Sequence, residues 1–256
     1  MLSKKIVKYI QSLSHKKLRD EENRFIAEGP KIVTEFLKER NFDCAILCAE
    51  NKWLSENKNL LESNPPQDIY EADEASLQKI SLLKAPNRVT GIFIKRPGVA
   101  SPHIENKLSL MLDDMQDPGN MGTIIRIADW FGIENIICSS NCVDCYNPKV
   151  VQATMGSLAR VNIYYTPLIP FIKENKAISV YAAALDGVSI SKLKNISEGI
   201  VVIGNESKGI SEELLNIATH KITIPKYGNA ESLNAAVATG IILSSLTPTP
   251  SRREGN

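Results

Sequence analysis

Six short apolar runs, separated by segments with helical spacing, dominate the second half of the chain. They lie at 108–113, 135–139, 161–165, 178–184, 199–203 and 221–224. Nearly continuous apolar strands that alternate with helices are typical of a parallel sheet buried on both faces. We therefore predict an α/β domain with a parallel sheet here, and we expect functional groups at the carboxyl ends of its strands.

The first part of the chain shows a smaller alternation of the same kind. Strands are expected at 25–27, 44–48, 68–70 and 89–94, with a helix after Gly29-Pro30 and another at 75–80. This pattern predicts a small three-layer α/β domain. The segment RPGVASPHIEN at 96–106 has little periodicity and reads as a linker. The predicted division is a domain at 1–97, a linker at 98–106, a second domain at 107–247 and a disordered tail at 248–256.

The stretch ITIPKYGNAESLNAAVATGIIL at 222–243 combines a short strand, a polar loop and a helix. The helix is expected to begin near Ser232, a residue type that caps helices well. One face of this helix is small and apolar, so another backbone can approach it closely; its residues are Leu233, Ala236, Val237, Gly240, Ile241 and Ser244. A capped buried helix and a polar ligand site at the helix start both fit this stretch.

Composition limits the classes of protein. The chain has 256 residues, 43% of them hydrophobic, and a net charge of +1, so attraction to nucleic acid has to be local. No apolar run reaches membrane-spanning length, and the N-terminus lacks the features of a secretory signal. Five cysteines without a framework spacing suit a reducing cytoplasm, and the single C-x-x-C pair, Cys142 and Cys145, has no nearby histidine to complete a zinc site. We expect no metal.

Residues 1–20 carry a local excess of positive charge. This stretch contains six basic residues and one acidic residue, Asp20; the basic residues are Lys4, Lys5, Lys8, Lys16, Lys17 and Arg19. A solvated surface helix explains this cluster, and so does a contact with the phosphates of a nucleic acid.

Polar blocks follow two of the predicted strands. The first, DDMQDPGNMG at 113–122, leads into a helix that carries Arg126, and a fixed guanidinium suits a phosphate. An ion pair of Arg126 with Asp129 is the alternative. The second block, GNESKGIS at 204–211, has the spacing of a phosphate-binding P-loop, but Ile210 stands where the lysine is required, which argues against an NTPase.

Three segments, in this order, carry a family resemblance. DDMQDPGNMGTIIRIADWFG, VIGNESKGIS and IPKYGNAESLNAAVATGIIL resemble the three motifs of the SpoU (TrmH) branch of the SPOUT methyltransferases, over roughly residues 108–246. The segment NRFIAEGPKIVTEFL is similar to the L30e-like RNA-binding domain at the N-terminus of the ribosomal-RNA members. Ile127, where a threonine is common, and Thr154–Ser157, in place of Ser-x-Gly-Ala, depart from the pattern.

The resemblance implies a fold and an activity. The fold is α/β: a parallel-sheet SPOUT domain with a deep trefoil knot, preceded by a small L30e-like domain, in a cytoplasmic homodimer that forms through the C-terminal domain. The activity is 2′-O-methylation of a ribose in RNA, most closely that of enzymes of ribosomal-RNA processing, with S-adenosylmethionine as the cofactor. A tRNA methyltransferase and a non-catalytic RNA-binding module are the alternatives; tRNA-modifying relatives commonly lack a full N-terminal domain.

Site residues follow from the matched motifs. The resemblance assigns catalysis to Asn120, Arg126, Glu206, Ser232 and Asn234, and cofactor binding to Gly204, Ile224 and Leu233. No histidine lies in the motifs, and an arginine stays protonated far above neutral pH. Our hypothesis therefore makes Arg126 a phosphate clamp, while a phosphate or water takes the ribose proton. Asn120 and Ser232 position the ribose, and Glu206 orients Arg126 or Asn120.

Overall fold

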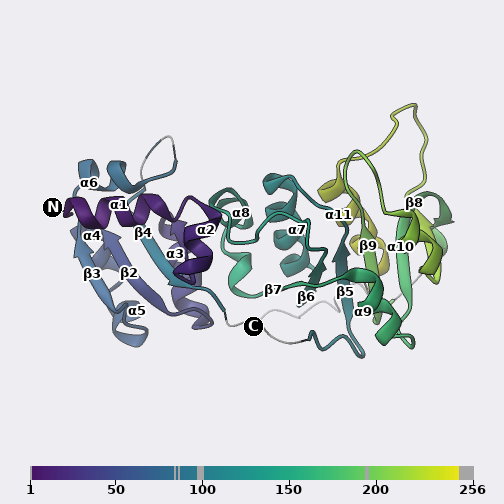
Figure 1. The fold of residues 1–256 in the computed structure, drawn as a ribbon, viewed down its shortest axis with the longest axis horizontal. Coiled ribbons are helices and arrows are strands. Elements are labelled where there is room, and N and C mark those ends of the chain that lie inside the picture. Colours follow the sequence, from purple (N-terminus) through teal and green to yellow (C-terminus); the bar gives the residue numbers. More distant parts are fainter. Residues whose placement is uncertain (1, 84, 86, 97–100, 194–195, 248–256) are drawn as a thin grey trace, which may run out of the picture. The chain divides into compact units, whose positions relative to one another are not determined.

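The protein folds into two compact units in the computed structural model (Figure 1). The structure describes residues 2–83, 85, 87–96, 101–193 and 196–247, so the predicted tail at 248–256 lies outside it. The first unit comprises Met1–Gly98 and Asp144–Arg160, and the second comprises Val99–Val143 and Val161–Asn256. None of the described helices has the length and apolar composition needed to cross a bilayer.

The first unit is built on a four-stranded sheet in the order β1-β4-β2-β3, in which β4 is antiparallel to β1 and β2, and β3 is parallel to β2. The strands are β1 (Arg24–Glu28), β2 (Cys44–Ala49), β3 (Asp68–Glu71) and β4 (Val89–Ile94). The helices are α1 (Lys4–Ser12), α2 (Lys16–Glu21), α3 (Pro30–Glu39), α4 (Asn51–Glu56), α5 (Lys58–Ser63), α6 (Glu74–Ile80) and α8 (Pro148–Thr154), with a 3₁₀ turn η1 (Ser157–Ala159). All four predicted strands are confirmed.

The segment Asp144–Arg160 packs in the first unit, although the sequence places it inside the second predicted domain. The ring of Tyr146 lies 4.7 Å from that of Phe25 in β1, measured between centroids. Asp144 accepts a 2.7 Å bond from the guanidinium of Arg19, which also donates to the carbonyls of Leu13 and Ser14. Burial of the Arg19 side chain to 2% exposure makes these partners necessary, because an unpaired buried charge is costly.

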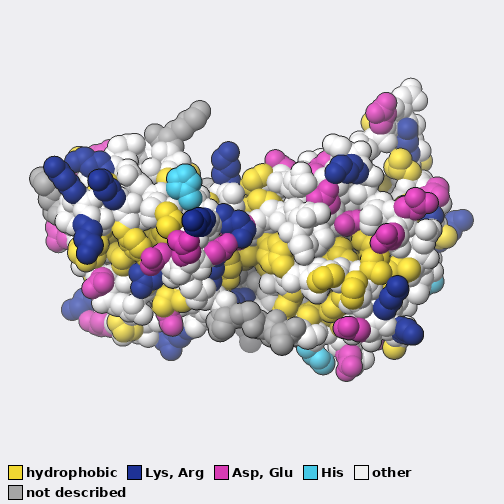
Figure 2. All heavy atoms as spheres, in the orientation of Figure 1, with side chains coloured by type: hydrophobic (Ala, Val, Ile, Leu, Met, Phe, Trp, Pro, Cys, Tyr) yellow, Lys and Arg dark blue, Asp and Glu magenta, His cyan; other side chains and the backbone are white. Residues whose placement is uncertain are grey.

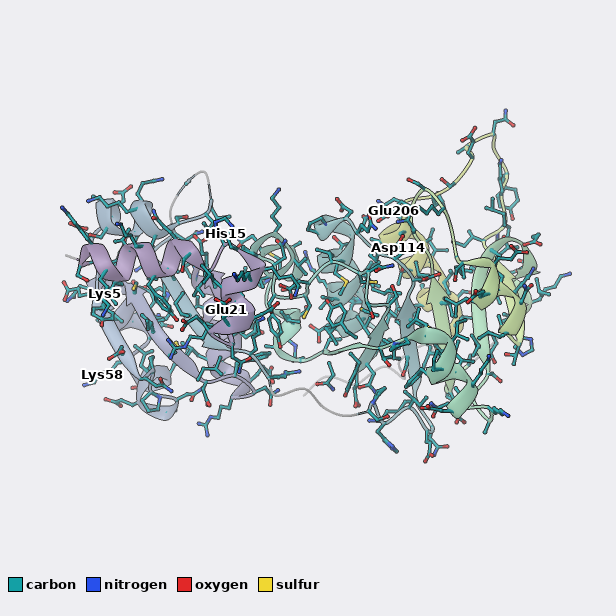
Figure 3. All side chains as sticks on the ribbon, in the orientation of Figure 1. Lys5, His15, Glu21, Lys58, Asp114 and Glu206 are labelled. Atoms are coloured by element: carbon teal, nitrogen blue, oxygen red, sulfur yellow. The ribbon has the colours of Figure 1, made fainter. Side chains whose placement is uncertain are left out.

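Helix α1 buries Ile10 and leaves lysines in solvent. Figure 2 shows basic side chains gathered over this part of the first unit, and Figure 3 marks Lys5 among them. Lys4, Lys5 and Lys8 are exposed, as a phosphate-binding surface requires. Arg19 is not part of that surface, because it is buried against Asp144. The sequence could not separate it from the lysines, since the carboxylate that binds it lies far along the chain.

The second unit contains a six-stranded, entirely parallel sheet in the order β10-β8-β9-β5-β6-β7. Its strands are β5 (Leu108–Leu112), β6 (Asn135–Cys138), β7 (Asn162–Tyr165), β8 (Val180–Ser189), β9 (Gly199–Ile203) and β10 (His220–Thr223). Its helices are α7 (Pro118–Trp130), α9 (Leu168–Glu174), α10 (Glu212–Ile217) and α11 (Ala235–Leu246), with a 3₁₀ turn η2 (Ile190–Lys192). The predicted parallel sheet and its six strands are confirmed.

The last helix begins later than predicted. It starts at Ala235, not near Ser232, because the side chain of Asn234 caps it by accepting from the backbone N–H groups of Ala236 and Val237 at 3.0 and 3.3 Å. Residues 224–234 therefore form a loop, and both Ser232 and Leu233 belong to it. This leaves the two side chains free to face a ligand.

Candidate active site

A cavity of about 890 Å³ opens in the second unit beside the middle of β8 and at the carboxyl ends of β9 and β10. Most of its lining comes from residues 183–186 in β8, from residues 203–210 at the end of β9 and in the loop after it, and from residues between 222 and 233 at the end of β10 and in the loop after it; α10 and α11 contribute the rest. Ile203, Ile222 and Ile242 contribute buried apolar walls. The volume is at the upper end of the range for small-molecule sites, and the position is where ligands bind in open parallel sheets.

Three polar side chains from the three motifs form one hydrogen-bonded chain. Asn234 donates through Nδ2 to Oδ1 of Asn120 at 2.8 Å, and Asn120 donates through Nδ2 to Oε1 of Glu206 at 2.6 Å. The oxygen of the same Asn234 amide, Oδ1, caps α11 by accepting from the N–H groups of Ala236 and Val237, which fixes the orientation of that amide. This orientation makes the Asn120 amide an acceptor toward Asn234 and a donor toward Glu206. Asn120 and Asn234 are thus in contact although they are 114 positions apart in sequence.

Local capping places Asn120 in the first turn of α7. The Asp117 side chain accepts from the backbone N–H of Asn120 at 2.7 Å, and Pro118 occupies the first turn, where its missing N–H has no cost. Asn120 is therefore held by its backbone, while its side chain is free to join Glu206 and Asn234.

The loop after β9 is shaped by its own hydrogen bonds. Asn205 and Gly209 exchange two backbone bonds, and the Asn205 side chain accepts from the N–H groups of Ser207 and Lys208. A Cβ atom on Gly204 would lie 2.2 Å from the carbonyl carbon of Gly209, so only glycine fits there. This tight turn presents Glu206 toward Asn120.

The loop after β5 is tied to the loop after β9. The Asn205 side chain donates to the carbonyl of Asp114 at 2.8 Å, and Asp113 accepts from the N–H of Ser211 at 2.8 Å. Lys208 forms an ion pair with Asp114 at 3.3 Å. Figure 3 shows Asp114 and Glu206 on the same side of the second unit. The lysine of the P-loop-like segment thus pairs with a carboxylate.

The predicted cofactor residues Gly204, Ile224 and Leu233 all line the cavity, and so do the predicted catalytic residues Glu206 and Ser232. Asn120 joins them through its hydrogen bond to Glu206, and Asn234 joins them through its hydrogen bond to Asn120. Six of these seven residues lie in loops, and only Asn120 belongs to a helix, α7. The structure therefore brings together seven of the eight residues that the sequence indicates.

Arg126 is the eighth, and it lies elsewhere. It is exposed and is not among the residues that line the cavity. At 100° per residue it is about 120° around α7 from Asn120. It shares a helix face with Trp130, which is 84% exposed. Arg126 therefore does not line the cavity of its own chain, and its role as a phosphate clamp stays a prediction.

Two features have no signal in the sequence motifs, and the first of them lines the cavity. This is the middle of β8, Ala183–Asp186, where nothing in the sequence AAALDG distinguishes the stretch from an ordinary strand. Cys142 accepts a bond from the N–H of Met115, in the loop after β5, at 3.3 Å. Hydrogen bonds from Cys138 and Ser139 lower the pKa of Cys142 to about 7 against the opposing effect of burial.

Comparison with solved structures supports the whole architecture. A TrmH-family protein from Porphyromonas gingivalis is 36% identical, with a TM-score of 0.84 over 96% of this chain and 98% of its own. An rRNA methyltransferase from Sinorhizobium meliloti, solved with bound AdoMet, is 33% identical, with a TM-score of 0.85 over 96% of this chain and 95% of its own.

Sequence comparison agrees. The 23S rRNA (guanosine(2553)-2′-O)-methyltransferase RlmP of Bacillus subtilis is 29% identical over 252 residues, which cover 93% of this chain and 94% of that protein. The model of an MRM3-like substrate binding domain matches residues 4–91. The model of the SpoU rRNA Methylase family matches residues 107–244 and so spans all three motifs. The chain belongs to the SpoU rRNA methylase family.

Proposed function

We propose that this protein methylates the 2′-oxygen of a ribose in RNA, in ribosomal RNA specifically, with S-adenosylmethionine as the methyl donor. The observation that carries the proposal is the hydrogen-bonded chain Asn234–Asn120–Glu206 beside a cavity made by the loops after β9 and β10. Relatives that align over nearly the whole chain include a 2′-O-methyltransferase of 23S rRNA and an rRNA methyltransferase with bound AdoMet.

The cavity fits S-adenosylmethionine in size and in chemistry. Ile203, Ile222 and Ile242 supply an apolar wall suited to an adenine ring. The backbone of the loops at Gly204, Ile224 and Leu233 supplies N–H and carbonyl groups, and the absence of a Cβ at Gly204 keeps that turn tight. When bound there, the cofactor supplies an electrophilic methyl group on a sulfonium.

The polar residues of the chain act on the ribose. Methyl transfer is an in-line displacement, so the site has to align the 2′-oxygen and let its proton leave. We assign alignment to Asn120 and Ser232, with Asn234 holding the Asn120 amide. Glu206 accepts from Asn120 and so orients it; the alternative, that Glu206 orients Arg126, lacks such a contact. The proton passes to an RNA phosphate or to water.

Arg126 does not line the cavity of its own chain, so we propose that it acts at the cavity of a second copy. It projects from a face of α7 that continues onto α11, which packs beside it, and this face exposes Trp130, Val237 and Ile241. Large exposed apolar side chains on neighbouring helices are typical of a protein interface. A two-fold contact between these faces forms the proposed homodimer and carries Arg126 to the partner's cavity, where it clamps a phosphate.

The N-terminal unit favours ribosomal RNA over tRNA. We propose that residues 1–97 form the RNA substrate-binding domain, joined by a linker at 98–106 to the methyltransferase domain at 107–247. The match of residues 4–91 to a substrate-binding domain and the exposed lysines of α1 support this assignment.

We propose that the methyltransferase domain contains a trefoil knot near its C-terminal helix α11. We also propose that the protein works in the cytoplasm. Helix α11 is held at its start by Asn120 and at its end by a bond from the N–H of Ile196 to the carbonyl of Leu246, as expected for a segment threaded between earlier ones. When the two ends of the chain are pulled apart by force, a knot keeps the end-to-end length below the value of about 3.5 Å per residue for a fully extended chain. Five cysteines without the spacing of a disulfide framework suit a reducing compartment.

Mapping of ribose methylation across total RNA, with and without the gene, tests the proposed function. One rRNA site should lose its methyl group and regain it when the purified protein and S-adenosylmethionine are added. Loss at a tRNA site would favour a tRNA enzyme. Failure to bind S-adenosylmethionine in calorimetry would leave a non-catalytic RNA-binding module.

A further inference from the structure

The loop Ile224–Asn234 carries an aromatic side chain that the three motifs leave without a role. Tyr227 is 98% exposed and still belongs to the rim of the cavity. Its neighbour Lys226 is exposed and lines the same rim. Figure 1 shows this yellow-green loop standing out from the rest of the second unit. An aromatic ring and a cation are therefore presented together at the mouth of the candidate active site.

The exposure of Tyr227 has no structural explanation within the chain. No hydrogen bond or ring contact of Tyr227 is present within the described residues. A ring left in water costs the free energy that its burial would provide, so an aromatic residue at a cavity mouth indicates a ligand that covers it. Every base of a nucleic acid offers such a cover, because each has a flat face that stacks on an aromatic ring.

We propose that Tyr227 stacks on a base of the RNA substrate beside the methylated ribose, and that Lys226 contacts a neighbouring phosphate. This inference rests on the proposed function. Ser232 follows Tyr227 by five residues, so at most about 17 Å of chain separates the ring from the ribose-positioning hydroxyl. That distance allows contact with the target nucleotide or one next to it. Unpaired bases held on aromatic rings are the usual mode of RNA recognition outside duplexes.

Two other ligands fit the geometry less well. The cofactor is matched by the buried walls of the cavity at Ile203 and Ile222, whereas the Tyr227 ring lies in solvent. A second copy of the chain is matched by the exposed face of α7 and α11, around Trp130, and Tyr227 lies on neither helix. RNA is the ligand that explains an aromatic residue next to a lysine at the entrance.

Three substitutions in the full-length protein test the stacking. Tyr227→Ala and Tyr227→Leu remove the aromatic face, and the leucine keeps apolar bulk, while Tyr227→Phe keeps the ring. With an rRNA fragment that contains the methylated site, we expect KM for RNA to rise about 5- to 150-fold in the first two variants, the range for loss of one base–aromatic stack. Tyr227→Phe should stay within about twofold of the unsubstituted protein.

The lysine has an independent readout. Lys226→Gln should reduce the slope of log affinity for RNA against log salt by about 0.7, the value for one phosphate contact of a single strand. A slope that does not change would remove Lys226 from the proposal. The salt series is measured on RNA binding alone, so the readout does not depend on turnover.

Controls separate the outcomes. Calorimetry with S-adenosylmethionine and gel filtration should give the same affinity and the same oligomeric state for all Tyr227 variants. An unchanged KM for RNA in Tyr227→Ala, equal losses in the leucine and phenylalanine variants, weaker cofactor binding, or a change of oligomeric state would each overturn the stacking role. In all of these cases the unsubstituted protein still methylates RNA; its failure to do so would overturn the proposed function as well.

Discussion

Asn120→Asp is the sharpest test of the hydrogen-bonded chain. The Asn120 amide donates to Glu206 and accepts from Asn234, at 2.6 and 2.8 Å. An aspartate keeps the size and the acceptor toward Asn234, but it has no N–H for Glu206. Two carboxylates would then face each other where a donor and an acceptor now meet.

The structure sets the size of the effect. Two unit charges at 2.6 Å repel by about 1.6 kcal/mol even at the dielectric constant of water. Loss of a hydrogen bond to a charged group adds about 1.5–3 kcal/mol. Both values are upper limits, because Glu206 is exposed, Asn120 is only half-buried, and the Glu206 side chain can rotate away. We expect kcat/KM for RNA to fall about 10²-fold.

A second substitution should reverse the loss. In Asn120→Asp with Glu206→Gln, the glutamine amide donates to the new aspartate, so the pair is complementary again with donor and acceptor exchanged. We expect the double variant to be at least about tenfold more active than Asn120→Asp alone, which a double-mutant cycle measures as coupling. The assay follows transfer of labelled methyl groups to an rRNA fragment.

The fold should tolerate the change. An aspartate in the first turn of α7 interacts favourably with the helix dipole, and the cap made by Asp117 uses the backbone of residue 120. Thermal unfolding should therefore be nearly unchanged. Full activity of Asn120→Asp, or no recovery in the double variant at equal stability, would refute the orienting role of Glu206.

Three further predictions follow. If Arg126 acts in the partner's cavity, an equal mixture of Arg126→Ala and Glu206→Gln protomers should regain about a quarter of normal activity after subunit exchange, and no gain would place both residues in one protomer's site. Trp130→Glu should weaken the dimer by about 30-fold or more in analytical ultracentrifugation, since buried tryptophans dominate interfaces, and an unchanged dimer would locate the interface elsewhere. Asp144→Ala should lower the free energy of unfolding by about 3–5 kcal/mol in urea, because Arg19 would lose its buried partner; Arg19→Met with Asp144→Leu should cost less, and equal losses would contradict the argument.

Strands and motifs were predictable because their signals are local. Most strands of the second unit contain a short apolar run that ends at a polar or glycine residue, and β9 followed by Gly204 is an example. The order of the strands was not predictable, since it depends on pairing between distant segments. The place of β8 between β9 and β10 brings Ala183–Asp186 into the cavity lining, and no residue of that stretch predicts this position.

Motif residues were predictable as a set, but their contacts were not. Family resemblance indicated Asn120, Glu206 and Asn234, whereas the direction of each hydrogen bond depends on how the three loops meet. The start of α11 moved from Ser232 to Ala235 because one good capping residue competed with another. The direction of Arg126 depends on the rotation of α7 about its axis, which is set by which residues the sheet buries.

The segment Asp144–Arg160 completes the packing of the first unit. That unit therefore cannot finish folding when only its first segment, Met1–Gly98, has left the ribosome. Translation has to continue from Gly98 to Arg160, which takes about 3–12 s at ordinary rates of synthesis. During this interval the Phe25 ring lacks its neighbour Tyr146, and the Arg19 guanidinium lacks its carboxylate. A nascent chain stalled before residue 144 should therefore be much more sensitive to protease than one stalled well beyond Arg160.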